Sequence, residues 1–191
     1  MKKLIHDALN AGIELRQQYL NRLDDDLIQA AGIMVQCFRD GGKVLACGNG
    51  GSASDAQHFV AELVNRFEIN RPALAAVAMV NDASVITSIS NDFSFDGVYE
   101  RQTEALGRKG DVLLAISTSG DSLNVLKAVE KASQIGMNVV ALTGRDGGKI
   151  GAHAGTTVHL NINHASTARV QEMHITCLHI LCTLIDETMF G

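Results

Sequence analysis

A short apolar strand that runs into a glycine-rich loop and then a helix constrains this fold more than any other stretch. Residues 44–47 read Val-Leu-Ala-Cys, and Gly48-Asn49-Gly50-Gly51 follow them. Ser52 and Ser54 then offer N-caps for a helix that we expect to continue past residue 62. Such a loop places bare N–H groups at the positive end of a helix dipole, which favours an anion such as phosphate.

Two titratable side chains lie farther along the same predicted helix. His58 and Glu62 are four residues apart and therefore share one helix face. At 1.5 Å rise per residue, they lie within about 15 Å of the loop. An anion cradle beside a titratable pair is the outline of a small-molecule site, although such a pair can also be purely structural.

Composition argues against several classes of function. The 191 residues are 46% hydrophobic, which suits one domain over residues 1–191. A net charge of −5 and the absence of tryptophan argue against a nucleic-acid partner. No apolar run is long enough for a bilayer or a signal peptide, so we expect no membrane partner and a cytoplasmic protein. Four cysteines without Cys-x-x-Cys spacing favour buried free thiols in a reducing compartment.

Strands and helices alternate along the chain, which predicts an α/β fold with a parallel sheet in a three-layer αβα sandwich. Two N-terminal helices are surplus to that unit. They could cap the sheet or join subunits, and we favour oligomerisation. Strands are expected at residues 44–47, 74–79, 112–116, 138–142 and 156–162. Helices are expected at 1–22, 24–40, 83–89, 96–106, 123–135 and 167–188, and from residue 52 through 62.

A second loop, Ser117-Thr118-Ser119-Gly120-Asp121-Ser122, follows the strand at 112–116. Ligands of open α/β sheets bind outside the carboxyl ends of the strands, where both loops should emerge. Four hydroxyls together with backbone N–H groups match the oxygens of a phosphate. Taken alone, this loop could be a capped turn, and neither loop has the spacing of a dinucleotide fingerprint or a Walker loop.

The last predicted helix is strongly apolar yet carries Gln171, Glu172, His174 and His179. Gln171 and His179 are about 80° apart around the helix, so both can face one pocket. His174 points elsewhere and is interpreted as structural, and Glu172 as a surface charge or an Arg169 partner. Together with His58 and Glu62, these side chains suit either a divalent metal or acid/base chemistry.

Five segments resemble the sugar isomerase (SIS) family, in this order: CGNGGSASDAQHFVAEL, Asn91-Asp92, LLAISTSGDSLNVLKAV, VVALTGRDGG and RVQEMHITCLHIL. The resemblance extends from about residue 40 to the C-terminus. It implies a homotetramer with active sites at subunit interfaces. It also implies aldose–ketose isomerisation of D-sedoheptulose 7-phosphate to D-glycero-D-manno-heptose 7-phosphate, the first step of bacterial ADP-heptose and lipopolysaccharide core synthesis.

The resemblance also assigns roles to residues. The catalytic acid/base pair would be Glu62 and His179, and one zinc ion per subunit would be held by His58, Glu62, Gln171 and His179. Since a zinc-bound carboxylate is a poorer base, metal binding and proton transfer by Glu62 belong to different states. Substrate would contact Asn49, Gly50, Gly51, Glu62, Asn91, Asp92, Ser117, Thr118, Ser119, Ser122 and Gln171.

Two alternatives belong to other functional classes. One relative with the same fold binds the bacterial replication initiator protein, and this chain shares the ending LIDETMF with it. That relative lacks the glutamate and the second histidine of the catalytic pair, whereas Glu62 and His179 are both present here. A non-catalytic sugar-phosphate sensor would keep the loops without needing Glu62. Because polar groups among apolar neighbours are costly, their presence favours the enzyme.

Overall fold

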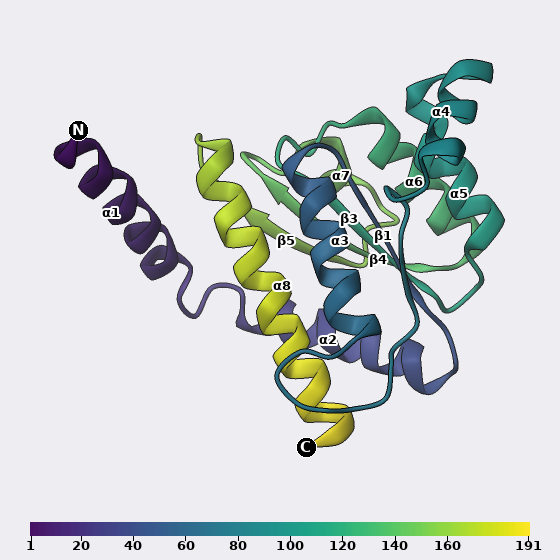
Figure 1. The fold of residues 1–191 in the computed structure, drawn as a ribbon, viewed down its shortest axis with the longest axis horizontal. Helices are drawn as coiled ribbons and strands as arrows, with labels where there is room; N and C mark the ends of the chain where they lie inside the picture. Colours follow the sequence, from purple (N-terminus) through teal and green to yellow (C-terminus); the bar gives the residue numbers. More distant parts are fainter.

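Five parallel strands form the centre of the molecule, and the computed structural model describes all 191 residues (Figure 1). The strands lie in the order β2-β1-β3-β4-β5, and every neighbouring pair is parallel. This confirms the predicted parallel sheet. The strands are β1 (Val44–Gly48), β2 (Ala76–Ala78), β3 (Val112–Ser117), β4 (Asn138–Gly144) and β5 (Val158–Ile162).

Helices cover both faces of the sheet, which confirms the three-layer sandwich. Alternate strand residues divide the core: Val44 and Ala46 belong to one buried cluster, Leu45 and Cys47 to the other. The first cluster packs under α2 (Asp24–Arg39), α3 (Gly51–Val64) and α8 (Thr167–Phe190). The second lies under α5 (Val98–Leu106), α6 (Leu123–Ile135) and α7 (Gly148–Ala152), with α4 (Ala83–Asp92) and a 3-10 turn (Phe95–Gly97) beside it.

The first helix, α1 (Lys2–Tyr19), stands away from the sheet (Figure 1). Its side chains Leu4, Ile5, Leu9 and Ile13 are all more than half exposed. The idea that both N-terminal helices could cap the sheet is therefore wrong for α1, because only α2 packs on it. The apolar stripe of α1 is left without a partner inside the chain.

Several predicted boundaries are wrong where glycine or local capping decides them. The helix α3 begins at Gly51 after Gly50, which has a φ of 57°, and no side chain caps it, so Ser52 and Ser54 are not N-caps. Asp82 accepts a hydrogen bond from the Val85 N–H at 3.0 Å and starts an α4 that continues to Asp92, beyond the predicted end at 89. The strand β2 is shorter than predicted, and α7 was not predicted.

His174 is fully buried, which supports its structural interpretation. Its Nε2 lies 2.9 Å from the Thr143 carbonyl oxygen, whereas its Nδ1 has no partner. The ring therefore sits as the neutral tautomer that donates through Nε2. Burial lowers the pKa of His174 from 6.5 to about 4.

We expect this lowered pKa to make folding stability depend on pH. In the unfolded chain His174 takes up a proton near pH 6.5, but in the folded chain only near pH 4. The stability that the folded protein gains from keeping His174 neutral is therefore complete above pH 6.5 and is lost as the pH falls toward 4. From pH 7.5 to 5 the loss should be about 2 kcal/mol. Urea unfolding of wild type and His174→Gln at both pH values measures it. An equal fall in stability in both proteins would contradict the assignment to His174.

All four cysteines are free and buried, as predicted. Burial raises the pKa of Cys37 to about 11 and that of Cys47, Cys177 and Cys182 to about 12. These thiols remain protonated near neutral pH, which makes them poor nucleophiles and poor metal ligands. None of the helices has the length and apolar character that a membrane crossing requires.

Candidate active site

The two predicted loops lie next to each other at the carboxyl edge of the sheet. β1 and β3 are neighbours, with Gly48 opposite Ile116 in register. β1 leads through Asn49 and Gly50 into α3, and β3 leads through the serine loop, residues 117–122, into α6. The chain leaves β1 toward β2 on one side and returns to β3 on the other, so this edge is the topological switch point where open α/β sheets bind ligands.

Glycine is required at several points of these loops. A side chain at Gly48 would come within 2.7 Å of the Ser52 carbonyl oxygen. Gly120 has a φ of 71°, and a side chain there would collide with the Gly147 carbonyl. The residues that follow β4 thus press directly against the serine loop, where the Gly120 carbonyl accepts a hydrogen bond from the Ile150 N–H at 2.9 Å.

The serine loop gathers three hydroxyls. Ser117 Oγ lies 3.0 Å from Ser122 Oγ and 3.4 Å from Ser119 Oγ. Ser119 Oγ accepts a hydrogen bond from the Asp121 N–H at 3.1 Å, and its own hydrogen can donate either to Ser117 Oγ or to an anion. Thr118 lies half-buried in the same turn. These groups can hold a phosphate through several short hydrogen bonds.

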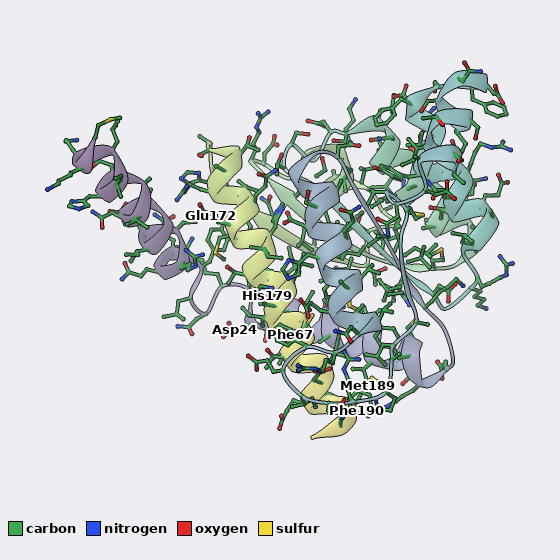
Figure 2. All side chains as sticks on the ribbon, viewed as in Figure 1. Asp24, Phe67, Glu172, His179, Met189 and Phe190 are labelled. Atoms are coloured by element: carbon green, nitrogen blue, oxygen red, sulfur yellow. The ribbon has the colours of Figure 1, made fainter.

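The titratable side chains meet between α3 and α8. His58 Nε2 lies 3.1 Å from Glu62 Oε1 and 3.1 Å from His179 Nε2, so one imidazole connects the other two groups. The Phe67 ring stacks on the far side of His179, with ring centroids 5.5 Å apart and planes inclined by 26° (Figure 2). The side chain of Glu62 is 26% exposed, which leaves it accessible to a ligand. A carboxylate and an imidazole from distant parts of the chain thus contact the same histidine.

The other predicted site residues are only partly brought together. The Gln171 side-chain amide packs against Gly51 at the start of α3. A Cβ atom at residue 51 would lie 2.7 Å from the Gln171 amide carbon. Asn91 and Asp92 end α4, are exposed, and hydrogen-bond only to each other, at 2.8 Å. Glu172 pairs with Arg169 at 2.7 Å, which confirms its interpretation as a partner of that arginine.

No three His, Cys, Asp or Glu side chains surround a common metal position in this structure. Both contacts of His58 use the same nitrogen, so His179, His58 and Glu62 form a row and not a closed shell. Nitrogen and oxygen donors of this kind nevertheless suit zinc. His58 Nε2 and His179 Nε2 lie 3.1 Å apart, and when both rings are neutral only one of these two nitrogens can donate a hydrogen bond to the other. These donor types therefore suit a cation, whereas the Gln171 amide lies apart from them, at the start of α3.

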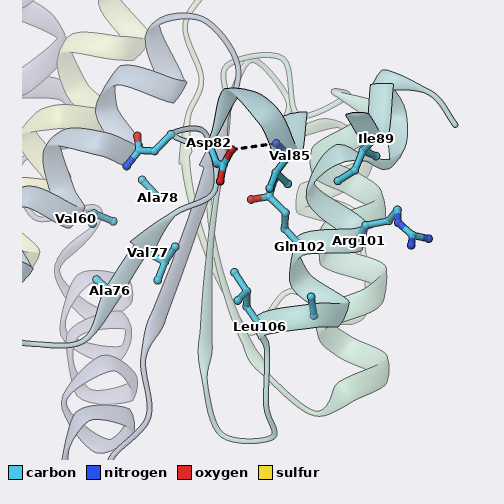
Figure 3. Close-up of a pocket in the computed structure, with 12 residues that line it drawn as sticks. Val60, Ala76, Val77, Ala78, Asp82, Val85, Ile89, Arg101, Gln102 and Leu106 are labelled. Atoms are coloured by element: carbon cyan, nitrogen blue, oxygen red, sulfur yellow. Dashed lines mark hydrogen bonds between the residues drawn. The ribbon is translucent and has the colours of Figure 1, made fainter. Parts of the chain in front are cut away.

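Two hollows differ in their relation to these groups. A largely apolar cavity of about 590 Å³ opens beside β2, between α4 and α5, and includes none of the predicted site residues (Figure 3). A polar hollow of about 550 Å³ borders the serine loop at Asp121 and also includes Arg145 and Asn163. Only the second adjoins the loop edge of the sheet.

Sequence reasoning missed two residues that connect these parts. Asn124 is buried at the start of α6 and hydrogen-bonds to Asn49, joining the two loops. Arg71 is buried after α3 and pairs with Asp186 of α8. The available signals were an asparagine two residues after the serine-rich loop and an arginine beside the only proline, but neither indicates its partner.

Comparisons with known proteins agree with this arrangement. The SIS domain family model matches residues 9–144. The chain is 49% identical to phosphoheptose isomerase of Shewanella loihica over 191 residues, covering 100% of this chain and 97% of the relative. It is 53% identical to that of Neisseria gonorrhoeae over 178 residues, covering 93% and 90%.

Solved structures give the same answer. Phosphoheptose isomerase of Neisseria gonorrhoeae superposes with a TM-score of 0.91 at 47% identity, covering 97% of this chain and 98% of the other. The enzyme of Francisella tularensis gives a TM-score of 0.92 at 40% identity, covering 97% of both chains. The chain therefore belongs to the SIS domain family and, within it, to the phosphoheptose isomerases.

Proposed function

We propose that this protein is an aldose–ketose isomerase that converts D-sedoheptulose 7-phosphate to D-glycero-D-manno-heptose 7-phosphate. The observations that carry the proposal are the contacts of Glu62 and His179 with His58 and the cluster of hydroxyls in the serine loop, which is suited to phosphate. Identity near 50% to phosphoheptose isomerases over nearly the whole chain supports it. The reaction would open the bacterial ADP-heptose route to the lipopolysaccharide core.

Isomerisation at this site moves two protons. The serine loop holds the phosphate, and the half-buried Glu62 takes a proton from C1 of the ketose to give an enediol(ate). Glu62 returns that proton at C2, while His179 transfers the O1 proton to O2, so that C1 becomes the aldehyde. General acid/base groups of this kind typically contribute 10²–10⁴-fold each.

A zinc ion, held by His58, Glu62, Gln171 and His179, would polarise the sugar carbonyl when bound. The row of His58, Glu62 and His179 supplies nitrogen and oxygen donors that suit it. We expect freshly purified protein to contain about one zinc per subunit. His179→Ala should lose most of that metal by elemental analysis, whereas His6→Ala on the exposed side of α1 should retain it. Equal metal content in both variants would contradict the ligand assignment.

Four subunits, with active sites at their interfaces, are the proposed assembly. Its support is the stripe of exposed apolar side chains on α1, which has no partner within the chain. Burying such a stripe between subunits removes apolar surface from water. A cytoplasmic location suits the four free thiols, because a reducing compartment keeps cysteines unpaired.

The test is an assay with D-sedoheptulose 7-phosphate followed by proton NMR, with and without chelator, beside a pull-down against the replication initiator. Formation of the aldose without capture of the initiator supports the isomerase. Capture without turnover, in the presence of added zinc, would instead favour the initiator-binding alternative. The relatives described above carry the isomerase name and give that alternative no support.

A further inference from the structure

Asn49 and Asn124 form a reciprocal pair of side-chain hydrogen bonds. Asn49 Nδ2 donates to Asn124 Oδ1, and Asn124 Nδ2 donates to Asn49 Oδ1, both at 2.9 Å. Asn124 is only 3% exposed, and its Oδ1 also accepts the Val125 N–H at 3.0 Å. Leaving a buried amide without its partner costs about 1–3 kcal/mol, so the pair resists separation.

The pair connects the two halves of the proposed site. Asn49 lies two residues before the start of α3, the helix that carries Glu62, and Asn124 is the second residue of α6, which follows the serine loop. The Tyr99 hydroxyl donates to the Gly48 carbonyl at 2.5 Å and lies 3.5 Å from Asn49 Oδ1, which fixes the β1 side of the connection. These amides thus join the residue that follows β1 to the helix that follows the phosphate loop, beyond the last β1–β3 pair, Gly48 and Ile116.

We propose that Asn124 is a positioning residue for the isomerisation. Through Asn49 it holds α3, and with it Glu62, at a fixed distance from the phosphate bound by the serine loop. Asn49 is the residue through which Asn124 acts, because its side chain joins the two loops. The proposal rests on the proposed function, because it assigns a role in that reaction.

A positioning role predicts a separation of turnover from anion binding. Asn124→Ala should lower kcat by about 10–10²-fold, because a displacement near 1 Å between the reacting groups can cost that much. The dissociation constant for inorganic phosphate should change by less than about threefold, since the hydroxyls of Ser117, Ser119 and Ser122 remain. A variant that is partly unfolded would instead lose turnover and phosphate binding together.

The experiment is a double-mutant cycle with Asn49→Ala, Asn124→Ala and both changes together, measuring kcat and phosphate affinity. If the two residues act as one unit, the double variant should be no more than about twofold slower than the slower single variant. The matched control is Gln57→Ala, which breaks another amide pair, Gln57 with Asn81 at 2.6 Å, and should keep wild-type kcat.

Three results would each overturn the proposal. The first is a kcat in the double variant that falls by the product of the two single losses, and the second is an unchanged kcat in Asn124→Ala. The third is a loss of phosphate affinity as large as the loss of kcat. If Asn124→Ala does not fold, the smaller change Asn124→Ser decides: lowered kcat with retained phosphate affinity supports positioning, and unchanged kcat overturns it. Failure of the proposed function is seen separately, as wild-type protein that binds phosphate but does not isomerise the sugar.

Discussion

Replacing Glu62 with glutamine is expected to lower kcat by about 10²–10⁴-fold while leaving sugar-phosphate binding nearly intact. Glutamine has nearly the same shape as glutamate but cannot accept the C1 proton. The contact between residue 62 and His58, 3.1 Å in the native protein, can persist because an amide oxygen still accepts a hydrogen bond. The loss should therefore appear in turnover and not in affinity for the substrate.

Steady-state kinetics and calorimetric titration with D-sedoheptulose 7-phosphate measure the two quantities separately. The control is Glu130→Gln, the same chemical change on the exposed side of α6, which should keep wild-type kcat. Turnover by Glu62→Gln within about threefold of wild type would remove this carboxylate from the proton transfer, because a general base contributes far more.

Removing Arg71 is expected to cost about 3–5 kcal/mol of folding stability, the largest loss that we anticipate from a single side chain. Arg71 Nε lies 2.5 Å from Asp186 Oδ1, and both side chains are buried. The guanidinium also donates to the carbonyls of Glu62 at 2.8 Å and Leu63 at 2.9 Å, which end α3. Without it, Asp186 is an unpaired buried charge and the Glu62 carbonyl loses its donor, whereas the Leu63 carbonyl keeps the Leu74 N–H at 3.0 Å.

This ion pair also connects the two catalytic helices. Asp186 is seven residues beyond His179 on α8 and therefore lies on nearly the same face two turns later. Because Arg71 joins that face to the backbone of Glu62, the end of α3 is held against α8. Part of the site geometry thus depends on a pair that touches no substrate.

Urea unfolding of Arg71→Met, Asp186→Leu and the double variant at one protein concentration tests this expectation. Each single variant should lose about 3–5 kcal/mol, and the double variant markedly less than their sum, because it leaves no charge unpaired. The exposed pair of Lys3 and Asp7, 2.8 Å apart, provides the control, and Lys3→Met should cost less than about 1 kcal/mol. Equal losses in Arg71→Met and Lys3→Met would contradict the account.

The sequence allowed the sheet and its two loops to be predicted because their signals are local. Residues 112–116 are continuously apolar, as a strand covered on both faces requires, and β3 includes all of them. The helix predicted at residues 123–135 has those bounds, and Gly136 ends it with a left-handed φ of 86°. Each of these features is decided by residues close together in the chain.

Features that depend on distant partners could not be predicted in this way. Nothing around Asn124 indicates that Asn49, 75 residues earlier, completes its hydrogen bonds. The sequence around Asp186 likewise does not indicate that Arg71, 115 residues earlier in the chain, pairs with it. Ser52 and Ser54 looked like helix caps, but Gly50 can adopt a positive φ and starts the helix without them. Tertiary contacts and backbone geometry decided these positions.

The exchange of substrate hydrogen with solvent tests the central claim most directly. Glu62 is partly exposed, so the proton that it removes from C1 can exchange with water before its return. Turnover of D-sedoheptulose 7-phosphate in heavy water, followed by NMR, should therefore place deuterium at C2 of the aldose, and Glu62→Gln should place almost none. Aldose formed by the wild-type protein without deuterium at C2 would contradict proton transfer through an enediol at this carboxylate.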